Sequence, residues 1–360
     1  MELRSLGNSF IQIFSSNKNR LLILFSAVFA ITSMIIAVFI GAVSVTVPDI
    51  FKIIAGKILN IQLYQGEQST EMIIWEIRFS RVLLAFFVGA SLSLAGAAFQ
   101  GLLQNPLADP YTIGVSSGAS LGAVIIIFFQ IQITILGSFT LPIVAILFGM
   151  IILLIVFALT HLASGKLTNE TIILAGIIIS SFISAFISLL IALIPREDIS
   201  QILYWIMGSV AMRGWGHVQL LVPFFIIGAI IILFHFRELN NMALGEQSAH
   251  YSGMNVKRKK TMILFAASIL TGSAVAVSGA IGFVGLVIPH LVRLLAGANH
   301  RIVLPLSMLF GGGYLVLADL LARSVISPKE LPIGVVTALI GSPIFTLLLI
   351  KNRKKKMAHL

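Results

Sequence analysis

The sequence contains no cysteine and few charged residues. Only 10% of its 360 residues are Asp, Glu, Lys or Arg, and 58% are hydrophobic, whereas soluble domains carry about 25% charged residues. The lack of cysteine excludes disulfides, zinc-thiolate sites and iron-sulfur ligation. A soluble fold of this length could not bury so much apolar surface, so the composition indicates a protein embedded in a membrane.

The sequence also lacks motifs for nucleotide, metal and nucleic-acid chemistry. No Gly-x4-Gly-Lys-Ser/Thr pattern occurs, so the chain cannot be its own P-loop ATPase. The histidines are scattered without metal-ligand spacing, and no basic stripe alternates with aromatic residues. We therefore predict no catalytic residue, metal site or cofactor in this chain, and no nucleic-acid partner.

What the sequence has instead is long stretches without Asp, Glu, Lys or Arg. Lipid offers the backbone no hydrogen bonds, so these stretches predict membrane-spanning helices, at about 20 residues per crossing. The third divides near Gly137 and Pro142, and the sixth near Gly279 and Gly282, which gives an all-α fold of about ten transmembrane helices. The stretches are 21–47, 82–108, 110–165, 171–195, 214–236, 261–292, 302–318 and 331–350.

The basic residues predict how the chain is oriented. An even number of crossings brings both termini to one side, and cytoplasmic flanks carry an excess of Lys and Arg. With both termini cytoplasmic, most of the 24 basic residues lie on the inner side. We therefore predict a cytoplasmic segment 1–20, a transmembrane domain 21–350 and a basic cytoplasmic tail 351–360.

A faint internal repeat joins two parts of the chain. Its two copies lie five predicted crossings apart and would run in opposite directions, as in the inverted repeats of many transporters. Close helix packing alone would also explain such small residues. The matching positions are Gly89, Gly96 and Pro106 in one copy and Gly272, Gly279 and Pro289 in the other.

Two polar segments on the predicted inner side are candidates for function. The loop 100–114 contains Pro106, Asp109 and Pro110. Irregular backbone at membrane depth is tolerated where it is buried in protein or lines a water-filled path. The loop is therefore predicted to form a gate, and an ordinary tight turn is the alternative. The longer segment 237–260 carries apolar residues among polar ones, which favours docking onto a soluble partner over a solvated connection.

Several ionisable residues lie near the predicted outer ends of spans, where charges are costly. Arg78 and Arg81 are three positions apart and share a helical face. They could meet carboxylates of an extracytoplasmic protein, or the charges could pair internally, with Asp319 neutralising Arg323 one turn later. Glu330 is the remaining member of this group.

Two other classes of function remain open from the residues alone. An ion-coupled secondary transporter would need a buried acid as its relay, and Asp319 is the candidate. An intramembrane hydrolase could use Ser116, which lies in a Gly-x-Ser-x-Gly pattern at 114–118. That pattern requires a strand, a strained turn and a helix, and no such context is predicted around it.

The motifs together resemble the FecCD-type permease family of ABC importers, which take up iron-siderophore, haem and cobalamin complexes. The resemblance covers roughly residues 78–350. The pieces that carry it are Arg78-Phe-Ser-Arg81, Gly96-Ala-Ala-Phe-Gln-Gly-Leu-Leu-Gln-Asn-Pro-Leu-Ala-Asp-Pro110, Gly114-Val-Ser-Ser-Gly-Ala119, Gly282-Phe-Val-Gly-Leu-Val-Ile-Pro-His-Leu-Val-Arg293 and Glu330-Leu-Pro-Ile-Gly334.

The resemblance implies a permease subunit of the bacterial plasma membrane that is not itself an enzyme. Two such subunits, identical or closely related, would surround a central pathway. Two cytoplasmic ATPases would bind the ATP, and an extracytoplasmic binding protein, expected to be a lipoprotein, would deliver the cargo. The expected cargo is an iron(III)-siderophore, with haem or cobalamin as the alternative.

The resemblance also implies roles for individual residues. Binding-protein docking falls on Arg78, Arg81 and Arg323. The cytoplasmic gate falls on Asn105, Leu107, Asn169 and Glu170. Coupling to the ATPase, within segment 237–260, falls on Leu244, Gly245, Ala249 and Gly253.

Overall fold

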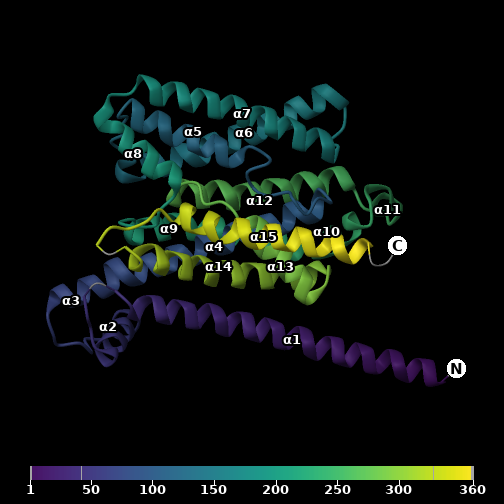
Figure 1. Cartoon of the computed structure of the whole chain (residues 1–360), viewed down its shortest axis with the longest axis horizontal. Coiled ribbons are helices and arrows are strands. Elements are labelled where there is room, and N and C mark those ends of the chain that lie inside the picture. Colours follow the sequence, from purple (N-terminus) through teal and green to yellow (C-terminus); the bar gives the residue numbers. More distant parts are fainter. Residues whose placement is uncertain (1, 42, 327, 358–360) are drawn as a thin grey trace.

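The computed structural model describes residues 2–41, 43–326 and 328–357, without the side chains of 2–16, 196–198, 349 and 351–357. Every regular element in these ranges is helical, and the long helices run side by side along the molecule (Figure 1). The basic side chains of the predicted tail lie outside the description. The helices are α1 (Glu2–Phe39), α2 (Val47–Leu59), α3 (Gln68–Met72), η1 (Ile73–Phe79), α4 (Ser80–Leu102), α5 (Val115–Phe128), η2 (Gly137–Phe139), α6 (Thr140–Ser164), α7 (Asn169–Leu193), α8 (Arg196–Met207), α9 (Gly214–Phe234), α10 (Phe236–Ala243), α11 (Glu246–Tyr251), α12 (Val256–Ser278), α13 (Val284–Ala296), α14 (His300–Ser324) and α15 (Ile333–Met357).

The predicted set of apolar helices is confirmed. Within the described ranges, seven helical segments are long and apolar enough to cross a membrane, and three shorter apolar helices, α5, α13 and the first part of α15, bring the set to ten. The two long stretches divide as expected. Gly137 lies between α5 and α6, and Gly279 and Gly282 lie between α12 and α13.

Some boundaries differ from the prediction, for local reasons. The predicted span 302–318 continues to Ser324, because the charged side chains of Asp319 and Arg323 are paired inside the bundle. The stretch between the first two predicted spans contains a further helix, α2, which the sequence did not predict. That helix begins where the Thr46 hydroxyl accepts a hydrogen bond from the backbone N–H of Asp49.

Helix α4 lies at the centre of the bundle, and most of its side chains are buried. It packs on α9, α12, α13 and α14. Small residues allow the closest approaches: a Cβ added to Gly96 would lie 1.9 Å from the carbonyl oxygen of Gly285, and one added to Gly89 would lie 2.3 Å from that of Gly311. The first copy of the glycine repeat thus serves close packing of α4 against α13 and α14.

Helix α12 carries Gly272, the first position of the second copy, and runs opposite to α4 (Figure 1). Its last residue, Ser278, accepts a hydrogen bond from the backbone N–H of Ser209 at 2.7 Å. Next to it, a Cβ added to Gly279 would lie 2.1 Å from the carbonyl oxygen of Trp205 in α8. The carboxyl end of α12 is therefore held tightly against the end of α8.

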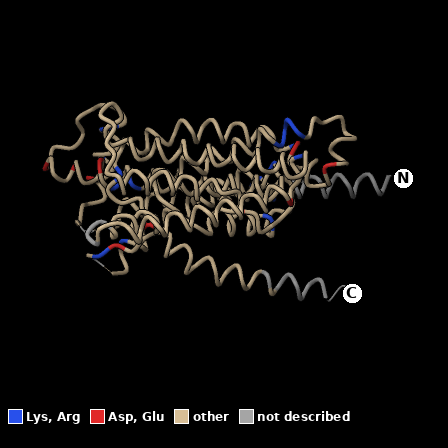
Figure 2. The backbone as a smooth tube through the Cα atoms, turned by 90° about the horizontal axis from the view of Figure 1, so that it is seen from above, with Lys and Arg blue, Asp and Glu red and all other residues tan. Residues whose placement is uncertain are grey.

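Charged residues gather at the two ends of the bundle, and its middle is almost free of them (Figure 2). One end, here called the α2 end, holds α2, α3 and α8 (Figure 1). The opposite end, here called the α11 end, holds α10 and α11 together with the start of α1 and the end of α15. This distribution is typical of a helical bundle that crosses a membrane.

Candidate functional site

A buried ion cluster at the α2 end joins α4 to α14. The Arg81 guanidinium donates to both carboxylate oxygens of Asp319, at 2.9–3.1 Å, and to Glu330 at 2.8 Å. The Asp319 side chain is 1% exposed and also lies 3.9 Å from the Arg323 guanidinium. Two arginines therefore share one buried aspartate: the expected internal pair of Asp319 with Arg323 is present, and Asp319 is paired with Arg81 as well.

The other arginines of this cluster hold the carboxyl end of α1. Arg78 is 4% exposed and donates to the backbone carbonyls of Val38 and Val43. Arg323 donates to the carbonyl of Ala37.

Together with Arg81, Arg78 and Arg323 line a cavity of about 510 Å³ beside Ile40 and Ile77. The three predicted docking arginines are thus brought together, and their docking role stays a prediction.

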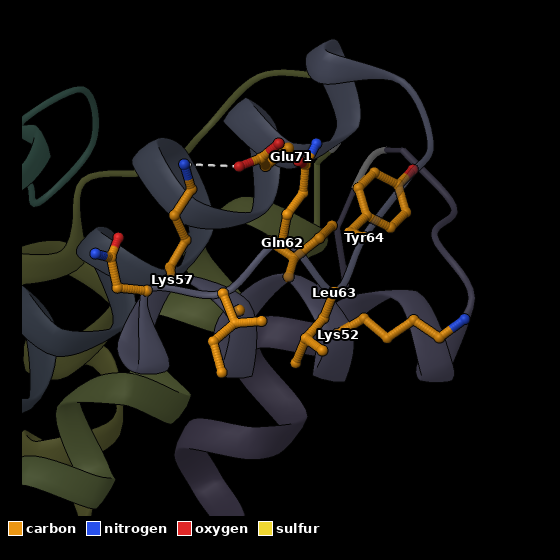
Figure 3. A pocket seen from close by; sticks show the side chains of 10 residues that line it. Lys52, Lys57, Gln62, Leu63, Tyr64 and Glu71 are labelled. Carbon is orange, nitrogen blue, oxygen red and sulfur yellow. Dashed lines mark ion pairs between the residues drawn. The ribbon is translucent and has the colours of Figure 1, made fainter.

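A second hollow at the α2 end was not predicted from the sequence. It has a volume of about 350 Å³ and lies between α2, the following loop and α3. Figure 3 shows Lys57 and Glu71 facing each other across it, and their charged atoms are 2.6 Å apart. Lys52, Gln62 and Tyr64 also line it. The Thr46 cap followed by Pro48 was the signal for α2, because proline is favoured in the first helical turn.

At the α11 end, the predicted gate loop connects α4 to α5 through a compact turn. The Asn105 side chain accepts a hydrogen bond from the backbone N–H of Leu107 at 2.9 Å, and the Leu107 side chain is 50% exposed. The Asp109 carboxylate accepts from the backbone N–H groups of Tyr111 and Thr112. Burial raises the pKa of Asp109 to about 6, against the effect of these two hydrogen bonds.

The predicted coupling segment forms two short helices, α10 and α11, joined at a sharp turn. Leu244 follows α10 with 77% of its surface exposed, whereas Ala249 in α11 is fully buried. Gly245 has φ +111° and Gly253 has φ +80°, backbone conformations that favour glycine. Leu244 is therefore displayed at the tip of the turn, and Ala249 anchors α11 to the bundle.

The second predicted gate position lies at the start of α7. Asn169 is half-buried and Glu170 is exposed. Asn169 accepts a hydrogen bond from Lys260, a buried residue of α12 that also reaches Glu246 in α11. Sequence reasoning missed this link, because Lys260 is one of four consecutive basic residues that read as an ordinary cytoplasmic flank.

Ser116 and Asp319, the residues on which the hydrolase and secondary-transporter interpretations depend, do not have the surroundings that those functions need. Ser116 is fully buried within α5, and the described residues around it contain no strand that could form a nucleophile elbow. Asp319 is paired with Arg81, whereas an ion relay needs a carboxylate that can take up and release the ion.

Comparison with known proteins matches this architecture to a family of permeases. The profile of the FecCD transport family matches residues 13–351. The chain belongs to the FecCD transport family. This FecCD permease is 47% identical to the uncharacterized ABC transporter permease protein YvrB of Bacillus subtilis, over 91% of this chain and 92% of the relative.

Two further relatives of this FecCD permease share the same lower identity with it, 39%, and are named for different cargoes. One is the cobalamin import system permease protein BtuC of Halobacterium salinarum, 39% identical over 78% of this chain and 74% of the relative. The other is the hemin transport system permease protein HmuU of Yersinia pestis, 39% identical over 79% of this chain and 85% of the relative.

A solved structure agrees with the fold of this FecCD permease. It is an inward-facing conformation assigned to a metal-chelate type ABC transporter, with a TM-score of 0.80 and 34% identity over 91% of this chain and 98% of the other. The chain is therefore a multi-pass membrane protein and the permease of an ABC importer. Permease subunits have no ATPase site of their own, in agreement with the missing P-loop pattern.

Proposed function

We propose that this permease takes up an iron(III)-siderophore across the bacterial plasma membrane, driven by two separate ATPases. The observation that supports the ATPase interaction is the turn between α10 and α11, which displays Leu244 at one end of a chain without a P-loop. Exposed apolar side chains of this kind serve as contacts for a soluble partner. The α11 end is then cytoplasmic, and both termini lie in the cytoplasm.

The opposite end of the bundle faces the extracytoplasmic binding protein in this proposal. The cavity lined by Arg78, Arg81 and Arg323 and the hollow beside Lys52 and Lys57 lie at this α2 end. Basic side chains there favour a partner surface that carries carboxylates. A second copy of the chain, or a close paralogue, completes the pathway, and the gate consists of Asn105, Leu107, Asn169 and Glu170.

The cargo is proposed as a metal chelate of the siderophore class, with haem or cobalamin as the alternatives. Equal identity to relatives named for cobalamin and hemin supports a bulky chelate. The match to a metal-chelate type transporter supports the same class. The chelate carries its own ligands, so no metal-binding side chain is required of the permease. Affinity measurements of the binding protein for ferric siderophore, haem and cobalamin decide among the three.

Uptake by proteoliposomes tests the function as a whole. The permease, its ATPase and its binding protein are reconstituted with ATP inside the vesicles, and entry of a radiolabelled ferric siderophore is measured. We expect ATP-dependent accumulation that stops when the ATPase carries a hydrolysis-dead substitution. Accumulation that persists with the dead ATPase and follows a proton or sodium gradient would instead favour a secondary transporter.

The substitution Leu244→Asp tests the coupling segment. A charge at the tip of the turn should weaken binding of the ATPase by about 30-fold, the effect of losing a central apolar contact. Affinity is measured by titrating purified ATPase onto the permease in nanodiscs. Met212→Asp is the matched control, because Met212 is also an exposed apolar residue but lies in the loop that follows α8. Equal weakening in both variants would remove the α10–α11 turn from the interface.

A further inference from the structure

A buried lysine at the start of α12 makes three polar contacts. Lys260 is 1% exposed, and its ammonium donates to the backbone carbonyl of Leu167, to the Asn169 side chain at 2.6 Å and to the Glu246 carboxylate at 2.5 Å. An ammonium has three N–H donors, so each donor has one acceptor. The charge is therefore compensated by one carboxylate and two neutral oxygens.

These acceptors belong to two separate parts of the molecule. Leu167 lies in the turn between α6 and α7, and Asn169, which belongs to the second predicted gate position, is the first residue of α7. Glu246 is the first residue of α11, directly after the Gly245 turn of the coupling segment. The lysine thus lies between the segment proposed to bind the ATPase and the turn proposed to gate the pathway, and it contacts both.

We propose that Lys260 is the positioning residue that transmits a movement of α11 to the turn between α6 and α7. This inference rests on the proposed function. If α11 moved alone, the buried ammonium would lose Glu246, its one carboxylate partner among the described side chains, and a buried charge without its partner is strongly unfavourable. The Lys260 ammonium therefore requires Glu246 and the turn at 167–169 to move together.

The neighbouring lysine offers a matched control. Lys259 pairs with Glu238 at 2.8 Å and contacts His235, and both partners lie close to α10. It carries the same charge at the same end of the bundle but makes no contact with the turn at 167–169 among its hydrogen bonds in the described residues. Lys259→Met removes an ion pair without removing the proposed connection.

The test follows the turn directly with a single thiol. Because the chain has no cysteine, Lys166→Cys places one reporter thiol per permease chain on the exposed side of the turn, and the partner proteins are used in cysteine-free form. The labelling rate of this thiol is measured in the complete complex, with and without a non-hydrolysable ATP analogue. We expect the analogue to change the rate about fivefold or more, the size of a typical coupling between sites.

With Lys260→Met, the labelling rate should become nearly the same with and without the ATP analogue, while the ATPase still binds and hydrolyses ATP. Lys259→Met should keep the full change. Glu246→Ala removes the same ion pair from the side of Glu246. Glu246 is half-exposed, so this variant should fold even if the Lys260 variant does not. It should abolish the change in labelling rate to the same extent. The double variant should be no worse than either single one, because both remove the same connection.

Other results would overturn the inference in distinguishable ways. A full response in Lys260→Met or Glu246→Ala would show that the turn moves without the lysine, while leaving the proposed function intact. If Lys260→Met and Lys259→Met reduced the change in labelling rate equally, the effect would come from losing a positive charge at the α11 end and not from the contacts of Lys260. If the reporter does not respond in the otherwise unchanged chain, the proposed ATPase coupling itself fails together with the inference.

Discussion

Replacing Asp319 with alanine should lower the free energy of unfolding by about 3–5 kcal/mol, the usual effect of removing one partner of a buried ion pair. Asp319 is the carboxylate shared by Arg81 and Arg323. Without it, Glu330 is the one acidic partner that Arg81 retains among the described side chains, and Arg323 loses the carboxylate beside it. The thermal unfolding midpoint of the purified permease in detergent, followed by tryptophan fluorescence, measures the loss.

Glu330→Ala is the control for this prediction. Glu330 contacts the same Arg81 guanidinium, but its side chain is 40% exposed. Water can replace it, so its loss should cost about 0–1 kcal/mol. Equal destabilisation by the two substitutions would contradict the view that Asp319 is the central charge of the cluster. An unchanged midpoint for Asp319→Ala would contradict it as well.

Replacing Gly96 with alanine should destabilise the bundle by about 3 kcal/mol, the upper part of the range for overpacking. The added methyl group would lie 1.9 Å from the Gly285 carbonyl oxygen and 2.6 Å from its carbonyl carbon. Both neighbours are backbone atoms of α13, so no side chain can rotate away. Helix α4 and helix α13 would have to separate, which should appear as a lower midpoint and a lower yield of folded protein.

The same substitution at Gly272, glycine to alanine, should not lower the stability of the bundle. Gly272 occupies the position of Gly89 in the repeat. Beyond its own stretch of helix and within the described residues, an added Cβ would meet one atom within 4 Å, a methyl carbon of Val115 at 3.6 Å, which is an ordinary contact. Alanine is favoured over glycine within a helix by about 1 kcal/mol. Gly272→Ala should therefore be neutral or stabilising, and marked destabilisation there would contradict the packing described for α12.

The helices were predictable because the membrane imposes a local rule. A stretch without charged residues must satisfy its own backbone, and this holds wherever the stretch lies in the sequence. The breaks at Gly137 and Gly279 followed from the same rule, since each long stretch exceeds one crossing. The rule does not reach helix α2, because its 13 residues are too few to cross a membrane and include charged ones such as Asp49 and Lys57.

The ion pairs and the lysine contacts could not be predicted in this way. Arg81 is separated from Asp319 by 238 positions and from Glu330 by 249, so their pairing depends on how α4 packs against α14. The sequence placed all three near the same end of the bundle, but it left docking and internal pairing open. Lys260 carried no distinguishing signal, because its neighbours Lys257, Arg258 and Lys259 are equally basic.

Helix α12 has a consequence for communication between the two membrane faces. Its 23 residues form a rod about 35 Å long, with Lys260 near one end and the tight contact between Gly279 and Trp205 at the other. A helix held at both ends conveys a shift from one face to the other. Linkage is reciprocal. If, as proposed, the ATPase binds at the α11 end and the binding protein at the α2 end, the factor by which nucleotide changes the affinity for the binding protein equals the factor by which the binding protein changes the affinity for nucleotide.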